Sequence, residues 1–294
     1  MARIEPLPGS DAIGHSYDVF GFYANPKSVK KELFDFALQK EITLEGHIWL
    51  LSTDIEYIAV RDTEIKTVSL RTKDAYSSEL AASVKLSGSY GGFSASVETD
   101  FSQSISDETD STYTSVRTNM NKWKLSEAQC GKAALPVEAC VEGGIGEYES
   151  SGAVEYLRDN YMGEVLVGGR GDYVATTKTS AFSSDTKISI VAESSFKSVA
   201  GMKVSAEQKQ LIEKFQENRS TSLYAIGGTA LSSITDTATY NAWLTSIDTR
   251  PVFCGFTRES LQPIWELAES PQRREVLRKA AQTYIPPHEM PSLA

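Results

Sequence analysis

The chain has 294 residues, 40% of them apolar, which is enough for a folded globular protein with a substantial core. Its formal net charge of −10 disfavours nucleic acid as a partner, because an acidic surface repels phosphate backbones. The longest apolar runs fall far short of the ~20 residues of a membrane-spanning helix, so any contact with a membrane must be made in another way.

Motifs that would carry catalysis are missing from the sequence. Its three histidines and three cysteines lack the spacing of a metal site, and no phosphate-binding, dinucleotide-binding or nucleophile-elbow motif occurs. We therefore expect no enzyme activity, with no catalytic residue, no metal ion and no cofactor. Cys130 and Cys140 could form a bridge, whereas buried free thiols are the simpler expectation for all three cysteines, Cys254 included.

The first predicted elements are a helix and a group of strands. Asn25 and Pro26 are a typical N-cap and first helical residue, which predicts an amphipathic helix from residue 26 to about Lys40. Residues 48–70 are rich in Ile, Val, Thr and Tyr and predict extended strands, with a break around Arg61 and Asp62.

Two later segments, at about residues 73–118 and 173–205, alternate apolar with polar residues. Each is long enough for two strands of the ~9–11 residues that cross a bilayer, so the pattern fits two amphipathic hairpins. A soluble antiparallel sheet with one wet face alternates in the same way, and the pattern alone favours that alternative. The high content of Ser and Gly weakens a stable sheet and instead favours a segment that changes structure.

Two glycine pairs, Gly168–Gly169 and Gly227–Gly228, follow strand-like apolar runs. Such a pair permits a sharp bend, a bulge or a close approach of two backbones, and an ordinary turn is the alternative. Next to the first pair, Arg170-Gly171-Asp172 spells an integrin-type tripeptide, although a match of three residues arises easily by chance.

Three helices are predicted in the C-terminal part. Ser205 and Gln208 form a capping box that begins the first of them. Its inward-facing residues are expected to be Leu211, Ile212 and Phe215. The others are predicted from Arg258 to about Glu269 and, after Ser270, over residues 271–284.

Three blocks of sequence carry a resemblance to a known family. The stretch from Leu157 to Gly169 resembles the signature of the membrane-attack-complex/perforin (MACPF) family, an aromatic-Gly-Thr-His-aromatic core followed at fixed distance by a glycine pair. Tyr161 and both glycines are in register, while residues 158–160 are Arg, Asp and Asn where the family has Gly, Thr and His. Gly14–Gly21 resembles the family's N-terminal Gly-Tyr-Asp segment, and Tyr240–Leu267 resembles its C-terminal block.

The resemblance implies an α+β fold, with a bent, twisted four-stranded antiparallel sheet flanked by two helical clusters that can refold into transmembrane β-hairpins. It divides the chain into an N-terminal extension (1–13), one MACPF-type domain (14–285) and a C-terminal tail (286–294). The two alternating segments lie at the positions where the family has its two helical clusters. The signature and hinge residues are then Tyr161, Gly168, Gly169, Gly227 and Gly228. The candidate lipid-facing residues are Tyr90, Phe93, Val97, Phe101, Ile188, Ile190 and Phe196. Valine at either glycine pair is expected to leave a folded monomer and to impair pore formation.

The function that the resemblance implies is that of a pore-forming toxin or defence protein, which oligomerises on a target membrane and inserts β-hairpins to form a β-barrel pore. The expected partners are further copies of the chain, a membrane lipid or receptor, and a second targeting protein, because the core domain occupies nearly all of the chain. No signal peptide is evident, so we expect a soluble protein that is stored in the cytoplasm or released by another route and then joins a membrane as an oligomer. The alternative is a non-lytic interaction or immune-related protein that keeps the fold as a scaffold.

Overall fold

The computed structural model describes residues 4–34, 36–86, 92–101, 110–128, 160–229, 234, 236–258, 260–268 and 270–283. At its centre lies an antiparallel sheet with the strand order β10-β9-β7-β6. These strands are β6 (Ile55–Leu70), β7 (Ser111–Glu127), β9 (Glu164–Lys178) and β10 (Arg219–Ile226). A further strand, β11 (Val252–Gly255), pairs with β9 beyond the end of β10. The α+β class and the four antiparallel strands expected at its centre are thus confirmed.

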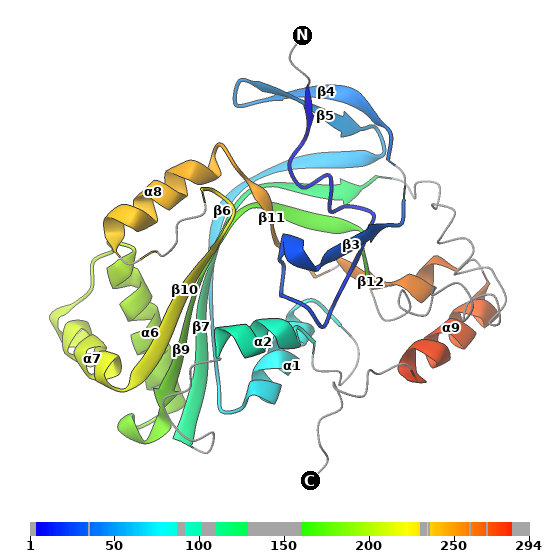
Figure 1. Ribbon diagram of the computed structural model, residues 1–294. Coiled ribbons are helices and arrows are strands. Elements are labelled where there is room, and N and C mark those ends of the chain that lie inside the picture. The colour runs from blue at the N-terminus through cyan, green and yellow to red at the C-terminus, as the bar shows by residue number, and fades with distance from the viewer. Residues whose placement is uncertain are drawn as a thin grey trace.

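Two smaller sheets accompany the central one. The first, at the top of Figure 1, consists of β1 (Glu5–Pro6), β5 (His47–Ser52) and β4 (Leu38–Leu44). The second has the order β12-β8-β2-β3 and consists of β2 (His15–Tyr17), β3 (Val29–Glu32), β8 (Asn160–Met162) and β12 (Leu261–Pro263). In this second sheet Ser16 and Gln262 both pair with Tyr161, so it joins parts of all three sequence blocks that carry the family resemblance.

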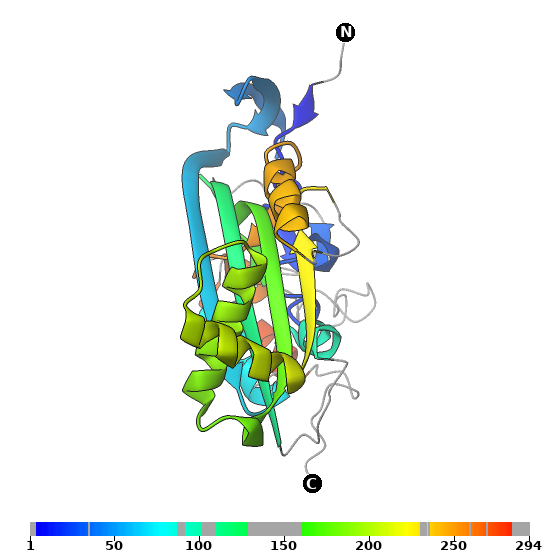
Figure 2. The same ribbon diagram turned by 90° about the vertical axis from the view of Figure 1, so that its left-hand side faces the viewer.

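Helices cover both faces of the central sheet (Figures 1 and 2). On one face lie α6 (Asp185–Val199), α7 (Ala206–Glu217) and α8 (Thr237–Ile247). On the other lie α1 (Lys73–Ser83) and α2 (Ser94–Asp100). The last helix, α9 (Pro271–Thr283), contacts the short 3₁₀ helix Ile264–Leu267 instead. Each face of the sheet therefore has its own apolar cluster.

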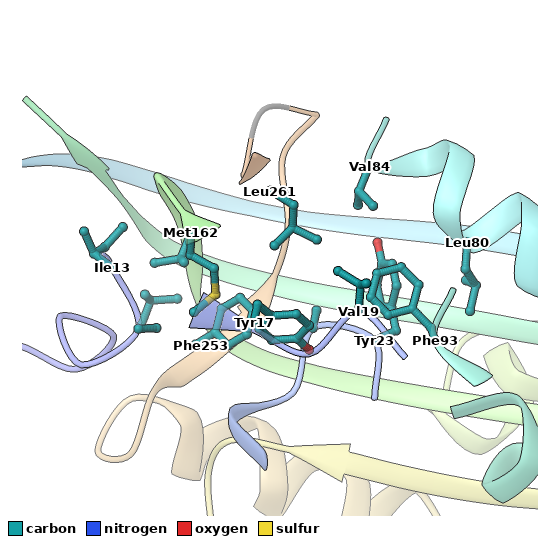
Figure 3. Packing of buried hydrophobic residues seen from close by; sticks show 14 of the residues in the cluster. Ile13, Tyr17, Val19, Tyr23, Leu80, Val84, Phe93, Met162, Phe253 and Leu261 are labelled. Atoms are coloured by element: carbon teal, nitrogen blue, oxygen red, sulfur yellow. The ribbon is translucent and has the colours of Figure 1, made fainter. Parts of the chain in front are cut away.

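The larger apolar cluster lies between the central sheet, the N-terminal segment and the first two helices. Figure 3 shows Val19 and Tyr23 of the N-terminal segment beside Phe93, with Leu80 and Val84 of the α1 region close by. The rings of Tyr23 and Phe93 meet edge to face, with 4.9 Å between their centroids. Aromatic packing by the N-terminal segment thus holds the first helical pair to the body of the protein.

The central sheet bends along one line that crosses its strands. The register of β6 against β7 shifts between Ala59 and Asp62, and that of β7 against β9 shifts between Asn121 and Trp123. Such shifts mark β-bulges, which increase the twist and bend the strands. Gly168 of β9 pairs with Asn121, so the first glycine pair continues the same line into the next strand. The strands curve over in Figure 1 as they approach the top of the molecule.

The helix predicted from residue 26 to about Lys40 is wrong. Asn25 caps only the 3₁₀ helix Pro26–Ser28, and the chain then enters β3 and, later, β4. The backbone N–H of Leu33 donates to the carbonyl oxygen of Gly14 at 2.8 Å, an extended pairing that a helix would forfeit. Pairing with a strand from elsewhere in the fold has overridden the local helix signal.

The helix predicted from Arg258 to about Glu269 is also wrong. Pro263 lies in the middle of this range, lacks a backbone N–H and disfavours helical torsions in the residue before it. The chain therefore forms β12 followed by a single 3₁₀ helix. In contrast, α8, which lies just before this range, was not predicted as a helix.

Other predicted elements are confirmed. Residues 48–70 form most of β5 and all of β6, and the break expected around residues 61–62 is the bulge within β6. The capping box at Ser205 begins α7, which buries Ile212 and Phe215, although Leu211 is 37% exposed. The last helix begins at residue 271, as predicted.

Candidate functional site

The two glycine pairs, which are far apart in the sequence, meet at the bend. Gly168–Gly169 lie within β9, and Gly227–Gly228 directly follow the neighbouring strand, β10. A Cβ atom on Gly168 would lie 1.9 Å from the carbonyl oxygen of Met120, and one on Gly227 would lie 2.6 Å from the carbonyl oxygen of Gly168. Gly227 and Gly228 also have φ angles of +78° and +68°, which favour glycine. The glycines therefore allow three segments of backbone to approach closely.

Helix α8 packs against both glycine pairs. The indole N–H of Trp243 donates to the carbonyl oxygen of Gly227 at 2.9 Å. A Cβ atom on Gly169 would lie 2.4 Å from Cδ1 of Ile247. The C-terminal block that resembles the family thus contacts the bend directly. The structure establishes that the glycine pairs lie at the bend. Their role as pivots stays a prediction.

Gly168→Ala is expected to lower the free energy of unfolding by about 1–3 kcal/mol, because the new Cβ would overlap the backbone of β7. Gly163→Ala is the matched control, since its Cβ would lie at an ordinary 3.5 Å from Cε2 of Tyr161. Urea denaturation measures both, and equal stabilities would contradict the close packing. The crowding also means that valine at Gly168 would disturb the monomer itself, contrary to the expectation from the sequence.

Tyr161, the aromatic residue of the family signature, lies in β8 rather than at the bend. The residue is 8% exposed, its ring meets the ring of Phe34 edge to face, and its hydroxyl donates to Oε1 of Gln262 at 2.8 Å. The residue therefore links two distant parts of the chain within the second small sheet. The structure does not bring it together with the glycine pairs.

The first helical pair buries residues that the sequence places on a lipid-facing side. Phe93, Val97 and Phe101 are each at most 4% exposed. The ring of Phe101 meets those of Tyr76 and Tyr113 edge to face, at 4.9 and 5.1 Å between centroids. In this conformation the helices are thus packed into the core, as the resemblance implies. Tyr90, a further candidate, lies outside the described residues.

The second helical pair lies on the opposite face of the sheet and behaves similarly. Ile188 and Phe196 are fully buried, whereas Ile190 is 52% exposed. The inward-facing residues of α6 recur at helical spacing and are Ile188, Val191, Ala192, Ser195 and Phe196. Ser184 is the N-cap of α6, since its hydroxyl accepts a hydrogen bond from the backbone N–H of Lys187.

Each helical pair connects two strands that are already neighbours in the central sheet. Helices α1 and α2 lie between β6 and β7, and helices α6 and α7 lie between β9 and β10. Leu70 pairs with Tyr113, and Thr177 pairs with Arg219. Both connections therefore leave the same end of the sheet, opposite the bend (Figure 1).

A buried group of charges links β7 and β9 to the rest of the core. Arg117, Arg170 and Asp172 are between 2% and 6% exposed. Oδ1 of Asp172 accepts from Nε of Arg117, and Oδ2 accepts from Nε of Arg170, both at 2.8 Å. The guanidinium of Arg170 also donates to the carbonyl oxygens of Tyr23, Ala24 and Cys254. The integrin-type tripeptide lies inside the protein, so it is not available to an adhesion receptor.

A second carboxyl group, that of the half-buried Asp100, faces these charges from α2. Its position follows Phe93 and Val97 at helical spacing, so it lies on the inward face of the helix. Burial and the nearby Asp172 carboxylate raise the pKa of Asp100 to about 7, although Arg117 and Arg170 oppose the shift. A carboxyl group whose pKa is raised in the folded state stabilises that state when protonated. This contribution is lost as the pH rises from about 4 to about 7.

Asp100→Asn is therefore expected to stabilise the protein most at neutral and alkaline pH. Relative to wild type, the free energy of unfolding should rise by up to about 4 kcal/mol at about pH 8 and should change little at about pH 4. Denaturant titrations of both proteins across this range measure the difference. A difference that does not vary with pH would contradict the assignment.

Cys254 is a buried free thiol, as expected from the sequence, and burial raises its pKa to about 12. Cys130 and Cys140 lie outside the described residues. Within the described ranges no group of three His, Cys, Asp or Glu side chains is placed to hold a metal ion. Among the same residues, no helix has the length and apolar character needed to cross a membrane.

Comparisons with known proteins agree with the fold and the blocks of sequence. The family model of the MAC/Perforin (MACPF) domain matches residues 161–294. The solved structure of GNIP1Aa from Chromobacterium piscinae is 28% identical, with a TM-score of 0.82, and the match covers 95% of this chain and 56% of that one. A protein with a MAC/Perforin domain from Bacteroides thetaiotaomicron is 12% identical, with a TM-score of 0.63, and the match covers 96% and 62% of the two chains.

This chain therefore spans less than two thirds of the length of either structure. No curated protein sequence matches it. The family model accounts for the C-terminal part, and the fold of a 28%-identical structure extends over almost the whole chain. On these grounds, residues 161–294 match the MACPF family model, and the fold of almost the whole chain is similar to that of a solved protein with a MAC/Perforin domain.

Proposed function

We propose that this protein forms pores, by oligomerising on a target membrane and inserting two β-hairpins from each subunit. The observation that carries the proposal is the connection of each helical pair to two strands that are already paired. If the helices unfold and the strands continue in their place, the existing β6–β7 and β9–β10 pairs lengthen without a change of register. Refolding then requires no new topology within the subunit.

The two connections have a suitable length for insertion. They comprise residues 71–112 and 178–218, so we propose a second inserting segment that extends beyond residue 205 and includes α7. Each connection is about 40 residues long, enough for two strands of the ~10 residues that a bilayer requires, with residues left for a turn and for extensions above the membrane.

The residues of the connections suit both conformations. In α6, Ile188 and Phe196 lie inward at helical spacing, and in an extended strand they also fall on one side with Ile190 and Ala192. The same apolar side chains can therefore be buried in the protein core or in lipid. Closure of a barrel by neighbouring subunits would satisfy the backbone groups of the inserted strands.

The match of residues 161–294 to the MACPF family model supports a homo-oligomer and a membrane as partners of this chain. We infer that a lipid, a receptor or a second protein directs it to its target, because the acidic chain has no evident attraction to anionic lipid. Release from the cell, or storage before release, is part of the same proposal.

The proposal is tested by adding purified protein to dye-filled vesicles of phosphatidylcholine, with and without cholesterol or anionic lipid, and to vesicles made from target-cell membranes. Dye release together with ring-shaped oligomers in electron micrographs is the expected result. Rings without release would favour the non-lytic scaffold. Neither rings nor release on any membrane would contradict the proposal.

A further inference from the structure

A cavity of about 810 Å³ opens between α1 and the face of the central sheet that carries Arg117. Lys66 of β6 pairs with Arg117 of β7 in register, so two cations lie side by side on the floor of the cavity. The ring of Tyr23 also lines it, with its centroid 4.1 Å from the guanidinium carbon of Arg117. The cavity therefore borders the buried group of charges formed by Arg117, Arg170 and Asp172.

The two arginines of that group differ in how many of their hydrogen-bond donors are used. A guanidinium group has five N–H donors. Arg170 donates to Asp172 and to three backbone carbonyl oxygens. Arg117 donates to Asp172 through Nε, and its terminal nitrogens Nη1 and Nη2 have no hydrogen-bond partner within the described part of the chain. Four N–H donors of a side chain that is only 7% exposed therefore lack a protein acceptor.

These unused donors can be reached from the cavity. Neither terminal nitrogen of Arg117 belongs to the fully buried side-chain atoms that lack a partner, so each keeps accessible surface, and the side chain lines the cavity. The amide oxygens of Asn119 and Asn121 on the same floor are enclosed instead. The part of the floor that a solute can contact is thus the guanidinium edge of Arg117.

The buried group carries more positive than negative charge. Arg117 and Arg170 share a single carboxylate, that of Asp172, at 2.8 Å each. The carboxyl group of Asp100 faces the same charges, and its pKa of about 7 leaves it largely protonated at about pH 6. A buried cation without a full counter-ion is costly, and an anion in the cavity would supply the missing negative charge.

The other charges of the lining oppose a polyanion. The lining cations are Lys66, Lys85, Arg117 and Arg258, and the lining carboxylates are Asp62, Glu64 and Glu79. Lys66 forms an ion pair with Glu79 at 3.9 Å. From Lys66 toward the bend, Glu64 and Asp62 follow along β6, ~7 Å farther for each step of two residues. One anionic group is therefore favoured beside Arg117, while the carboxylates repel further negative charge.

We propose that this cavity binds a small molecule through one singly charged oxyanion group, a carboxylate or a phosphodiester, which accepts hydrogen bonds from Nη1 and Nη2 of Arg117. Two parallel N–H···O bonds from one guanidinium to two oxygens of such a group match in geometry and in charge. A free carboxylic acid and the head group of a phospholipid both offer this chemistry. The volume of the cavity is within the range of ligand pockets, ~300–1,000 Å³.

Binding is tested on the full chain without membranes, at about pH 6 and constant ionic strength, by isothermal titration calorimetry and saturation-transfer NMR. The probes are lactate and benzoate for a free carboxylate, glycerophosphocholine for a phospholipid head group, and glycerol as the uncharged comparison. Saturable binding of at least one anionic probe, and none of glycerol, is the expected result. Carboxylates and glycerophosphocholine compete for the same donors, so the tighter of the two identifies the source of the natural ligand.

Arg117→Lys keeps a cation beside Asp172 and removes both terminal nitrogens, so it should weaken binding by about tenfold or more. Arg219→Lys is the matched control. This half-buried arginine lies over the rings of Tyr173 and Phe215, in the apolar cluster on the opposite face of the sheet. The control variant should bind the probes as wild type does.

A second variant leaves the buried group of charges intact. Lys66→Met removes the neighbouring cation and leaves Glu79 unpaired, so it should weaken binding by about threefold even if Arg117→Lys does not fold. The proposal is overturned if no anionic probe binds, if glycerol binds as tightly as the anions, or if Arg117→Lys and Lys66→Met both bind as tightly as Arg219→Lys. Because these measurements need no membrane, their outcome is independent of the proposed pore formation.

Discussion

Cross-linking α6 to the central sheet is expected to abolish membrane permeabilisation while membrane binding persists. Oγ1 of Thr67 in β6 donates to Oε2 of Glu193 in α6 at 3.4 Å, so cysteines at these two positions can be joined by a short bifunctional thiol reagent. The link prevents the departure of α6 from the sheet, which insertion of the second hairpin requires. A reagent that contains a disulfide allows reductant to restore dye release.

The control for this experiment is a cross-link between strands that stay paired throughout. Lys124 of β7 and Glu164 of β9 form an ion pair at 2.7 Å, and cysteines at these positions can be joined by the same reagent. Dye release should survive this second link. If the link between β6 and α6 leaves the rate of release unchanged, the second helical pair does not insert.

Asp172→Asn is expected to lower the free energy of unfolding by about 3–5 kcal/mol, which is the largest effect that we expect of any single substitution here. Burial alone would raise the pKa of Asp172, but Arg170 and Arg117 hold it below its ordinary value. Asparagine keeps the shape of the side chain and removes its charge, so that two buried guanidinium groups lose their shared counter-ion. Urea denaturation near neutral pH measures the loss.

An exposed ion pair provides the comparison. Glu275 accepts a hydrogen bond from Arg278 on the surface of α9, and Glu275→Gln should leave the free energy of unfolding nearly unchanged, because solvent screens such pairs. Similar losses for Asp172→Asn and Glu275→Gln would show that the buried charges contribute little to stability.

Much of the fold can be predicted from local patterns. Glycine pairs, the capping box at Ser205 and the strand-rich composition of residues 48–70 each reflect a requirement that lies within a few residues of the chain. The helix expected over residues 258–269 fails on a local signal, Pro263, whereas the helix expected after Asn25 fails because distant pairing decides the outcome. The segment after Asn25 becomes β3 because β2 lies beside it, and no local signal reports that neighbour.

The alternating segments show why the candidate site could be predicted only in part. Ile188 and Phe196 fit both a strand of period two and a helix, and the closed subunit uses the helical arrangement. Period alone therefore cannot tell the two conformations apart. The buried partnership of Arg117 with Asp172 joins positions that are far apart in the chain, so only the folded sheet reveals it.

The most direct measurement follows residues 93–98 as the protein moves from solution to the membrane, with an environment-sensitive dye at single cysteines. In the closed subunit Phe93, Ser96 and Val97 are buried, and Ser96 accepts a hydrogen bond from the backbone N–H of Tyr23 at 2.8 Å. Ala95 is half-buried, and Glu98 is exposed. An inserted strand instead alternates strictly, because successive side chains point to opposite faces.

On membranes, positions 93, 95 and 97 should therefore report lipid, and positions 94, 96 and 98 should report water. The decisive change is at position 96, where the dye passes from a buried to an aqueous environment. At position 95 the dye instead passes from a half-buried to a lipid environment. A membrane-bound protein in which 93, 96 and 97 remain the buried set has kept α2 as a helix. That result would contradict the proposal that this segment inserts as a β-hairpin.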